Sequence, residues 1–275
     1  MQRRLVSVVV SIAVLATCWI SDGVAADLPL KARPKIRATE PTFSWTGFYV
    51  GGHVGGGWSD RWNSSSNPLP DPVGFGAAPL SFSQKGSSVV AGGQVGYNWL
   101  VAPNWLFGVE ADLFRVHIQT SVTQPALQLD GTPFTGAIDC PTPQICTSFM
   151  DRNLDWVGTV RGRFGSTWDR LLAYVTGGFA YGRVGYAANY MVCCQHPASF
   201  TETKNGWTAG GGLEYALQGN WTIRAEYLYV RLNSATATIL QTSPPNPAFA
   251  MRYDWSDTGL HIARAALNYQ FAAMR

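Results

Sequence analysis

Charged side chains recur at every second position in several segments of this 275-residue chain, and two residues is the side-chain period of a β-strand. Glu214 precedes a Gln-Gly-Asn turn sequence at 218–220 and Arg224 follows it, so we expect the two residues to lie close across a hairpin. If the face that carries these charged side chains is buried, the charges are tolerated only when they form ion pairs. The residues expected to form this charge network are Glu110, Asp112, Asp155, Arg161, Arg163, Glu214, Arg224, Glu226 and Arg264.

Hydrolytic chemistry would need a nucleophile, a base and an orienting acid side by side. His53 lies in a glycine-rich segment with no serine beside it, and His261 opens the last apolar segment. No Ser-His-acid set can be assembled from these residues. We therefore expect no catalytic residues, no cofactor and no metal site.

Cysteine chemistry points to disulfides. The cysteines that remain after the N-terminal segment are Cys140, Cys146, Cys193 and Cys194. An even number in an exported chain favours disulfides over metal binding, and the only histidine nearby is His196. A Cys140–Cys146 bridge would close a short loop. A bond between the adjacent Cys193 and Cys194 would be strained, so pairing between the two segments is the alternative.

The N-terminal segment has the features of a secretory signal peptide. Two arginines precede an apolar run over 5–20, and 24–26 fits a small-x-small cleavage site, so we expect cleavage after residue 26. The run is short for a membrane anchor. A lipoprotein site at Cys18 is less favoured, because a threonine precedes that cysteine. Residues 27–44 are Pro-rich and basic without an apolar period, and are expected to form an extended lead-in.

Eight later segments alternate an uncharged apolar face with a polar or charged face, and they occupy 46–58, 88–99, 105–114, 154–164, 171–182, 206–217, 221–230 and 261–271. Their connections alternate strictly between short links, at 101–104, 165–170 and 218–220, and long polar links, at 59–86, 116–152, 187–204 and 232–256. This alternation is typical of a membrane barrel, in which periplasmic turns are short and external loops are long.

The polarity of each strand face indicates whether that face meets lipid or the interior of the barrel. Because the apolar faces carry no charge, we expect them to meet lipid and the charged faces to fill the interior of a closed barrel. Trp and Tyr near strand ends are typical of interfacial girdles. The girdle residues expected are Trp58, Trp99, Trp105, Trp207, Trp221 and Tyr269.

The sequence thus predicts an all-β, eight-stranded, antiparallel, up-and-down transmembrane β-barrel over 45–271, with a short tail at 272–275 and both termini in the periplasm. The lumen of such a barrel is about as wide as its own side chains. We therefore expect a salt-bridged interior without a wide pore. A net charge of +3 gives no argument for a nucleic-acid partner.

Several motifs carry a resemblance. The stretches "WTGFYVGGHVGGGW", "GTVRGRFG", "AYVTGGFAYG" and "LNYQF" occur in order, and with them the chain resembles the small outer-membrane porin-family β-barrels of alphaproteobacteria, related in architecture to the OmpA membrane domain. The resemblance covers nearly the whole chain. Members usually end on the aromatic residue of the last strand, which the outer-membrane assembly machinery reads, whereas four residues follow Phe271 here.

The resemblance implies a structural outer-membrane protein and surface antigen, with outer-membrane lipid, lipopolysaccharide and the assembly machinery as partners. An alternative is a surface protein that binds hemin or a host or other surface ligand for adhesion. The conceivable hemin contacts are Tyr49, His53, His117 and His196. A narrow ion channel or an outer-membrane hydrolase is less favoured.

Overall fold

The computed structural model describes residues 43–69, 76–134, 146–191, 196–242 and 245–271. The expected signal peptide, nearly all of the lead-in and the C-terminal tail lie outside these residues. The strands of the described part are β1 (Gly47–Ser59), β2 (Trp62–Leu69), β3 (Leu80–Gln84), β4 (Ser87–Ala102), β5 (Trp105–Pro125), β6 (Thr147–Trp168), β7 (Leu171–Tyr190), β8 (Ala198–Ala216), β9 (Trp221–Leu232), β10 (Ala235–Thr242), β11 (Pro245–Trp255) and β12 (Thr258–Gln270). Within these ranges no helix is long and apolar enough to cross a membrane.

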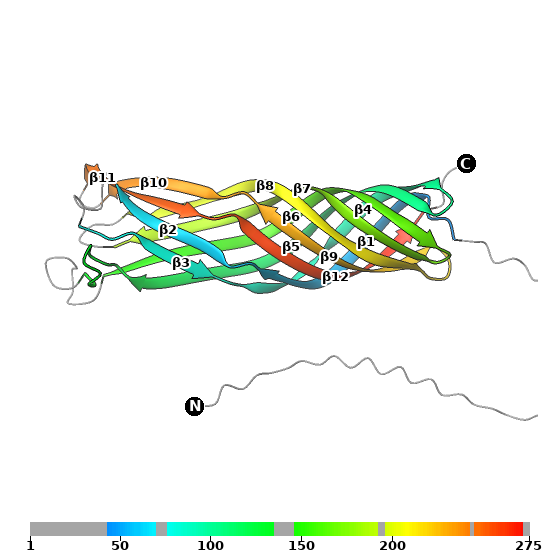
Figure 1. Cartoon of the computed structure of the whole chain (residues 1–275), viewed down its shortest axis with the longest axis horizontal. Coiled ribbons are helices and arrows are strands. Elements are labelled where there is room, and N and C mark those ends of the chain that lie inside the picture. Colours follow the sequence, from blue (N-terminus) through cyan, green and yellow to red (C-terminus); the bar gives the residue numbers. More distant parts are fainter. Residues whose placement is uncertain (1–42, 70–75, 135–145, 192–195, 243–244, 272–275) are drawn as a thin grey trace, which may run out of the picture. The chain divides into compact units, whose positions relative to one another are not determined.

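Eight of the strands close into an antiparallel barrel in the order β1-β12-β9-β8-β7-β6-β5-β4 (Figure 1). The predicted fold class is therefore confirmed. Short turns join β4 to β5, β6 to β7 and β8 to β9 at one end of the barrel, which we call the turn end. The turn between β8 and β9 uses Gly219 with a φ of 69°, a left-handed conformation that glycine adopts without strain.

The other four strands form a second sheet in the order β10-β11-β2-β3. Two residues separate each of them from a barrel strand, at 60–61, 85–86, 233–234 and 256–257, and the order matches that of β9-β12-β1-β4. The second sheet therefore continues one side of the barrel wall beyond the closed ring, at the end we call the sheet end (Figure 1).

This sheet corrects the expectation of long loops at 59–86 and 232–256. The segment "WNSSSNPL" contains Pro, Ser and Asn, which are typical of loops, yet it is strand β2. Every second side chain of β2 is buried beneath the second sheet. Pairing with β11 and β3 satisfies its backbone and outweighs the loop-like composition.

The strands on the other side of the wall are much longer than the segments expected at 105–114, 154–164, 171–182 and 206–217. β5, β6, β7 and β8 contain 21, 22, 20 and 19 residues. A tilted strand needs only about 9–11 residues to cross the hydrocarbon. These strands occupy much of the stretches expected as loops at 116–152 and 187–204, and they continue the wall opposite the second sheet.

The polarity of the two faces reverses along the wall. Near the turn end, apolar side chains such as Val109 and Val175 point outward, while Glu110 and Thr176 point inward and are buried. Near the sheet end the interior is an apolar core, and exposed side chains such as Ser121 point outward. The aromatic members of this core are Trp62, Phe82, Phe114, Phe134, Tyr186, Tyr190, Tyr253 and Trp255. We call the two parts the turn half and the sheet half.

A β-bulge in β6 explains a difference from the expected faces. The pairing of β6 with β7 shifts register between Leu154 and Trp156. A bulge inserts one extra residue and reverses which side of the strand later side chains occupy. Leu154, expected on the outer face, is therefore fully buried in the apolar core.

Candidate functional site

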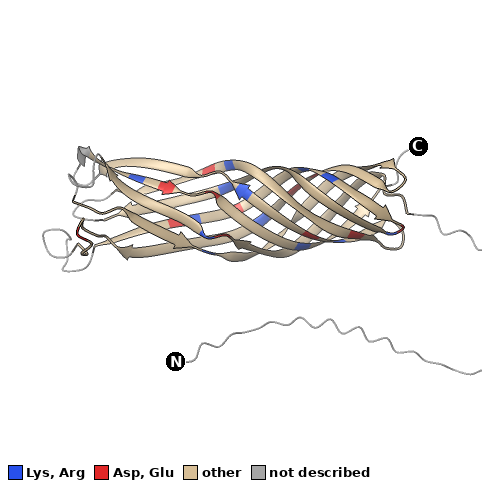
Figure 2. Cartoon of the chain, viewed as in Figure 1, with Lys and Arg blue, Asp and Glu red and all other residues tan. Residues whose placement is uncertain are grey.

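Eight charged side chains meet inside the turn half, and Figure 2 shows basic and acidic residues interspersed along the strands. They come from five strands: β5, β6, β8, β9 and β12. The members are Glu110, Asp112, Arg161, Arg163, Glu214, Arg224, Glu226 and Arg264, and each is at most 5% exposed. Strand alternation places them inside, because each lies between outward-facing apolar neighbours. We call these eight residues the charge network.

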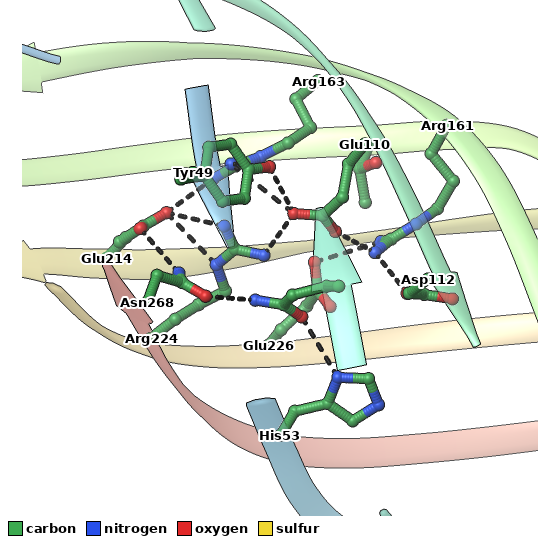
Figure 3. Close-up of polar contacts among 12 residues, drawn as sticks. Tyr49, His53, Glu110, Asp112, Arg161, Arg163, Glu214, Arg224, Glu226 and Asn268 are labelled. Atoms are coloured by element: carbon green, nitrogen blue, oxygen red, sulfur yellow. Dashed lines mark hydrogen bonds and ion pairs between the residues drawn. The ribbon is translucent and has the colours of Figure 1, made fainter. Parts of the chain in front are cut away.

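Arg161 is the centre of one part of the charge network. Its Nη2 pairs with Glu110 and lies 2.9 Å from Oδ2 of Asp112, while its Nη1 lies 3.1 Å from Oε1 of Glu226. Arg264 contacts two of the same carboxylates, at 2.7 Å from Asp112 and 2.5 Å from Glu226. Figure 3 shows Arg161 of β6 together with Glu110 and Asp112 of β5 and Glu226 of β9.

Arg224 and Arg163 form the other part. Nη1 of Arg224 lies 2.5 Å from Oε2 of Glu110, and its Nη2 lies 3.0 Å from Oε2 of Glu214. Nη2 of Arg163 donates to the same Glu214 oxygen at 2.8 Å (Figure 3). Glu110 is therefore shared between the two parts and joins them into one continuous network.

Neutral side chains satisfy the remaining acceptors. The hydroxyls of Tyr49 and Tyr174 donate to Glu110 at 2.5 Å and to Glu226 at 2.7 Å. Asn268 donates to Glu214 at 2.9 Å and accepts a hydrogen bond from Gln94 at 2.6 Å. The predicted site did not include Tyr174, although its even-numbered position in 171–182, two residues before Thr176, was a signal for the inner face.

The charge network is electrically balanced. Its four guanidinium groups face four carboxylates, and each carboxylate has at least one guanidinium partner. Pairing of this completeness is what allows ionised groups to be buried. Chemically, the arrangement fills the interior and ties five strands together. Among the described residues no group of three or more His, Cys, Asp or Glu side chains is suited to hold a metal ion.

Asp155 does not join the charge network. It lies at the β6 bulge with a side chain that is one-third exposed, where Asn153 donates to it at 2.9 Å and His117 lies 3.9 Å away. The sequence suggested five acidic members because the bulge that shifts Asp155 has no clear sequence signal. Without Asp155 the charge network has four carboxylates and four guanidinium groups.

The sheet half contains a buried arginine that the sequence did not suggest. Arg152 packs its guanidinium carbon 5.1 Å from the Trp62 ring centroid and 5.9 Å from that of Tyr186. Its donors reach Thr258 and two backbone carbonyls, and no described carboxylate forms an ion pair with it. Burial lowers the pKa of Arg152 to about 10.

The tryptophans expected at the interfaces are exposed on the outer wall. Trp99, Trp105 and Trp221 lie toward the turn end of their strands, and Trp58 and Trp207 lie farther toward the sheet end. Tyr269 is half-buried and packs edge-on against Trp221 at 5.1 Å between ring centroids. Trp62 and Trp255, in contrast, belong to the apolar core.

The conceivable hemin contacts do not converge. Tyr49 and His53 are buried inside the turn half, His117 is exposed on the outer wall, and His196 is buried in the sheet half. Cys146 is disulfide-bonded, and Cys140, Cys193 and Cys194 lie outside the described residues.

His261, considered as a general base, lies at the outer rim of the turn half. Its Nε2 lies 2.8 Å from Oδ1 of Asp60 and its Nδ1 lies 2.6 Å from the Tyr227 hydroxyl, while Trp58 stacks on the ring. Burial opposes a low pKa for Asp60, but hydrogen bonds from Tyr229 and His261 lower it. The groups bonded to this histidine are a carboxylate and a phenol, which do not form a hydrolytic triad with it.

Comparison with known proteins gives consistent matches. A family model described as "Outer membrane protein beta-barrel domain" matches residues 38–271. The 31 kDa outer-membrane immunogenic protein of Brucella melitensis biotype 1 is 31% identical over 269 residues, covering 95% of this chain and 99% of that protein. The 22 kDa outer membrane protein of Rhizobium leguminosarum bv. viciae is 26% identical over 199 residues, covering 71% and 68%.

Solved structures with a similar course of the chain include two outer-membrane proteins. The outer membrane protease OmpT of Escherichia coli aligns with a TM-score of 0.45 at 9% identity, covering 83% of this chain and 98% of that one. OprG of Pseudomonas aeruginosa aligns with a TM-score of 0.45 at 13% identity, covering 84% and 99%.

Proposed function

The chain belongs to the outer membrane protein β-barrel family, and we propose that it is a structural barrel that supports the envelope and displays its sheet half at the cell surface. In this proposal the barrel forms no wide pore. Its partners are outer-membrane lipid, lipopolysaccharide and the outer-membrane assembly machinery.

The observation that carries the proposal is the balanced charge network across the interior. An aqueous channel needs polar groups that line a free path, whereas these eight side chains contact each other through the middle of the barrel. Removing any one of them would leave the network with one uncompensated buried charge. The interior therefore acts as a structural brace.

The reversal of polarity along the wall supports an orientation for the barrel. The outward apolar belt of the turn half suits lipid, and the polar outer surface of the sheet half suits water. We place the sheet half outside the cell, and the short turns and both termini in the periplasm. The name of the Brucella relative, an outer-membrane immunogenic protein, supports display at the surface.

The proposal assigns no enzymatic activity to the chain. The names of the Brucella and Rhizobium relatives describe membrane and immunogenic proteins, and no described serine hydrogen-bonds to His261.

Planar-bilayer conductance of the refolded mature protein tests the closed interior. We expect the wild-type protein to give no large steady current. The double variant Arg161→Ala with Glu110→Ala removes the pair that joins both parts of the network, so we expect intermittent currents from it. A steady wild-type current of the size of a general porin would overturn the proposal.

A further inference from the structure

Two exposed arginines flank a tryptophan on the outer wall, at the border between the turn half and the sheet half. In the strand register Arg115 of β5 lies opposite Trp156 of β6, and Trp156 lies opposite Arg183 of β7. Neither arginine makes an ion pair or hydrogen bond with another described residue. Neighbouring strands are about 4.8 Å apart, so the two arginine backbones are about 10 Å apart.

This row lies beside two register shifts, one in the β5–β6 pairing after Arg115 and one in the β6–β7 pairing at Trp156. β-Bulges re-aim side chains and are over-represented beside functional sites. Here they coincide with the point where the outward surface changes from apolar to polar.

On the turn side of the row the wall is apolar. Leu113, Val160 and Phe179 are each at least half-exposed on adjacent strands. Trp156 and Tyr181 make an edge-to-face contact at 5.8 Å between ring centroids, which gives an aromatic border to this surface. Such a surface suits acyl chains.

On the sheet side of the row these three strands and β8 form a hollow of about 430 Å³. Its lining includes the exposed side chains of Gln119, Ser121 and Thr201. Asp151 and Asn153 also line it, and Oδ1 of each is buried without a hydrogen-bond partner among the described residues. Carboxylate, amide and hydroxyl side chains therefore line this hollow, and such groups suit the hydroxyls of a sugar.

We propose that the outer wall of β5, β6, β7 and β8 binds a phosphorylated glycolipid of the lipopolysaccharide class. Its acyl chains lie against Leu113, Val160 and Phe179, its phosphates bind Arg115 and Arg183, and its sugar occupies the hollow beyond them. The order apolar, cationic and hydroxyl-rich along the strands matches the order of groups in such a lipid.

Each part of the surface gives a separate argument for a phosphorylated glycolipid as the ligand. Guanidinium groups bind phosphate with paired, charge-assisted hydrogen bonds, which makes arginine suited to this position. A simple anionic phospholipid would satisfy the arginines and leave the polar hollow unused. The glycolipid site rests on the proposed orientation, because lipopolysaccharide belongs to the outer leaflet.

Binding to the refolded mature protein in detergent, measured with purified lipopolysaccharide, tests the site. We expect Arg115→Gln with Arg183→Gln to weaken binding about tenfold or more, since each lost guanidinium removes its paired, charge-assisted hydrogen bonds to phosphate. Arg252→Gln, which changes an exposed arginine in β11, is the matched control and should bind as the wild type does. Circular dichroism establishes that each variant is folded.

Two further binding measurements test the contributions of the phosphates and of the sugar separately. Dephosphorylated lipopolysaccharide should bind the wild type as weakly as intact lipopolysaccharide binds the double variant. Ser121→Tyr, which fills the hollow, should weaken lipopolysaccharide binding and leave binding of an anionic phospholipid unchanged.

The site is wrong if the arginine double variant binds lipopolysaccharide as the wild type does. It is also wrong if an anionic phospholipid binds the wild type equally well. Conductance in glycolipid-free bilayers tests the structural proposal separately, so a failure of one is distinguishable from a failure of the other.

Discussion

Glu214 and Arg224 face each other across the β8–β9 hairpin, in register and 3.0 Å apart between Oε2 and Nη2. Each also has a second partner in the charge network: Arg163 lies 2.8 Å from Glu214, and Glu110 lies 2.5 Å from Arg224. The hairpin pair is therefore coupled to the strands on the opposite side of the barrel.

Arg224→Ala should lower the free energy of unfolding by about 3–5 kcal/mol, because it leaves two buried carboxylates short of a counter-charge. Adding Glu214→Ala should recover part of that loss, and only part, because Glu110 remains undercompensated. Urea titration of the protein refolded in lipid vesicles measures both changes. Neutral results for both single variants would contradict the paired interior.

Leu213 and Leu240 provide a direct test of which surface meets lipid, because both are 53% exposed and lie in different halves. Leu213→Arg, in the turn half, should cost about 2–4 kcal/mol if it lies near the midplane of the bilayer. Leu240→Arg, in the second sheet, should change stability by less than about 0.5 kcal/mol. The same vesicle titrations apply. Equal costs, or the reverse order, would contradict the lipid-facing assignment.

Gly131 and Gly219 suit a test of orientation. Both occupy turns with a positive φ, at 82° and 69°, and a Cβ added at either would have no neighbour within 4 Å. A short epitope inserted after Gly131 should be labelled by antibody on intact cells. The same epitope after Gly219 should be labelled only once the outer membrane is permeabilised. Labelling in the opposite pattern would reverse the proposed topology.

His196 should make the sheet half sensitive to acid. Burial lowers its pKa, so the unfolded state takes up a proton at a higher pH than the folded state does. Stability should therefore be fully present above the ordinary pKa of about 6.5 and fall as the pH drops from there toward the folded pKa.

Hydrogen exchange of β11 amides at pH 7 and pH 5, corrected for intrinsic rates, reports this change because the Tyr253 hydroxyl of β11 donates to the His196 carbonyl at 2.6 Å. His196→Gln should remove most of the pH dependence. His117→Gln is the control, since His117 is 65% exposed and should leave the response intact. An undiminished response in His196→Gln would exclude this histidine as its source.

Strict alternation made the turn half predictable. Glu110, Arg161 and Arg224 each lie between apolar neighbours, so the period of two assigns them to one face without knowledge of the fold. The hairpin relation of Glu214 to Arg224 also followed from distance to a recognisable turn. These are local signals, and a single strand or hairpin contains all of them.

The sheet half could not be predicted from the sequence, because the interactions that form it are not local. Trp62 lies in a Ser- and Asn-rich stretch typical of a loop, and its burial depends on pairing with strands far away in sequence. The bulge at Leu154 cannot be read from a pattern of apolar residues, since a one-residue insertion in pairing leaves the sequence unchanged. The faces predicted for the side chains of Leu154 and Asp155 were therefore both wrong.

The continuous strands of β5 to β8 have a consequence for assembly. In the proposed orientation their distal segments, with Arg115, Gln119 and Thr201 among them, must cross the hydrocarbon before they reach water. The aromatic core around Trp62, Tyr186 and Trp255 closes only after that crossing, and its burial then releases hydrophobic free energy on the far side. We therefore expect burial of this distal core to favour translocation of the strands in one direction and to oppose their return through the membrane.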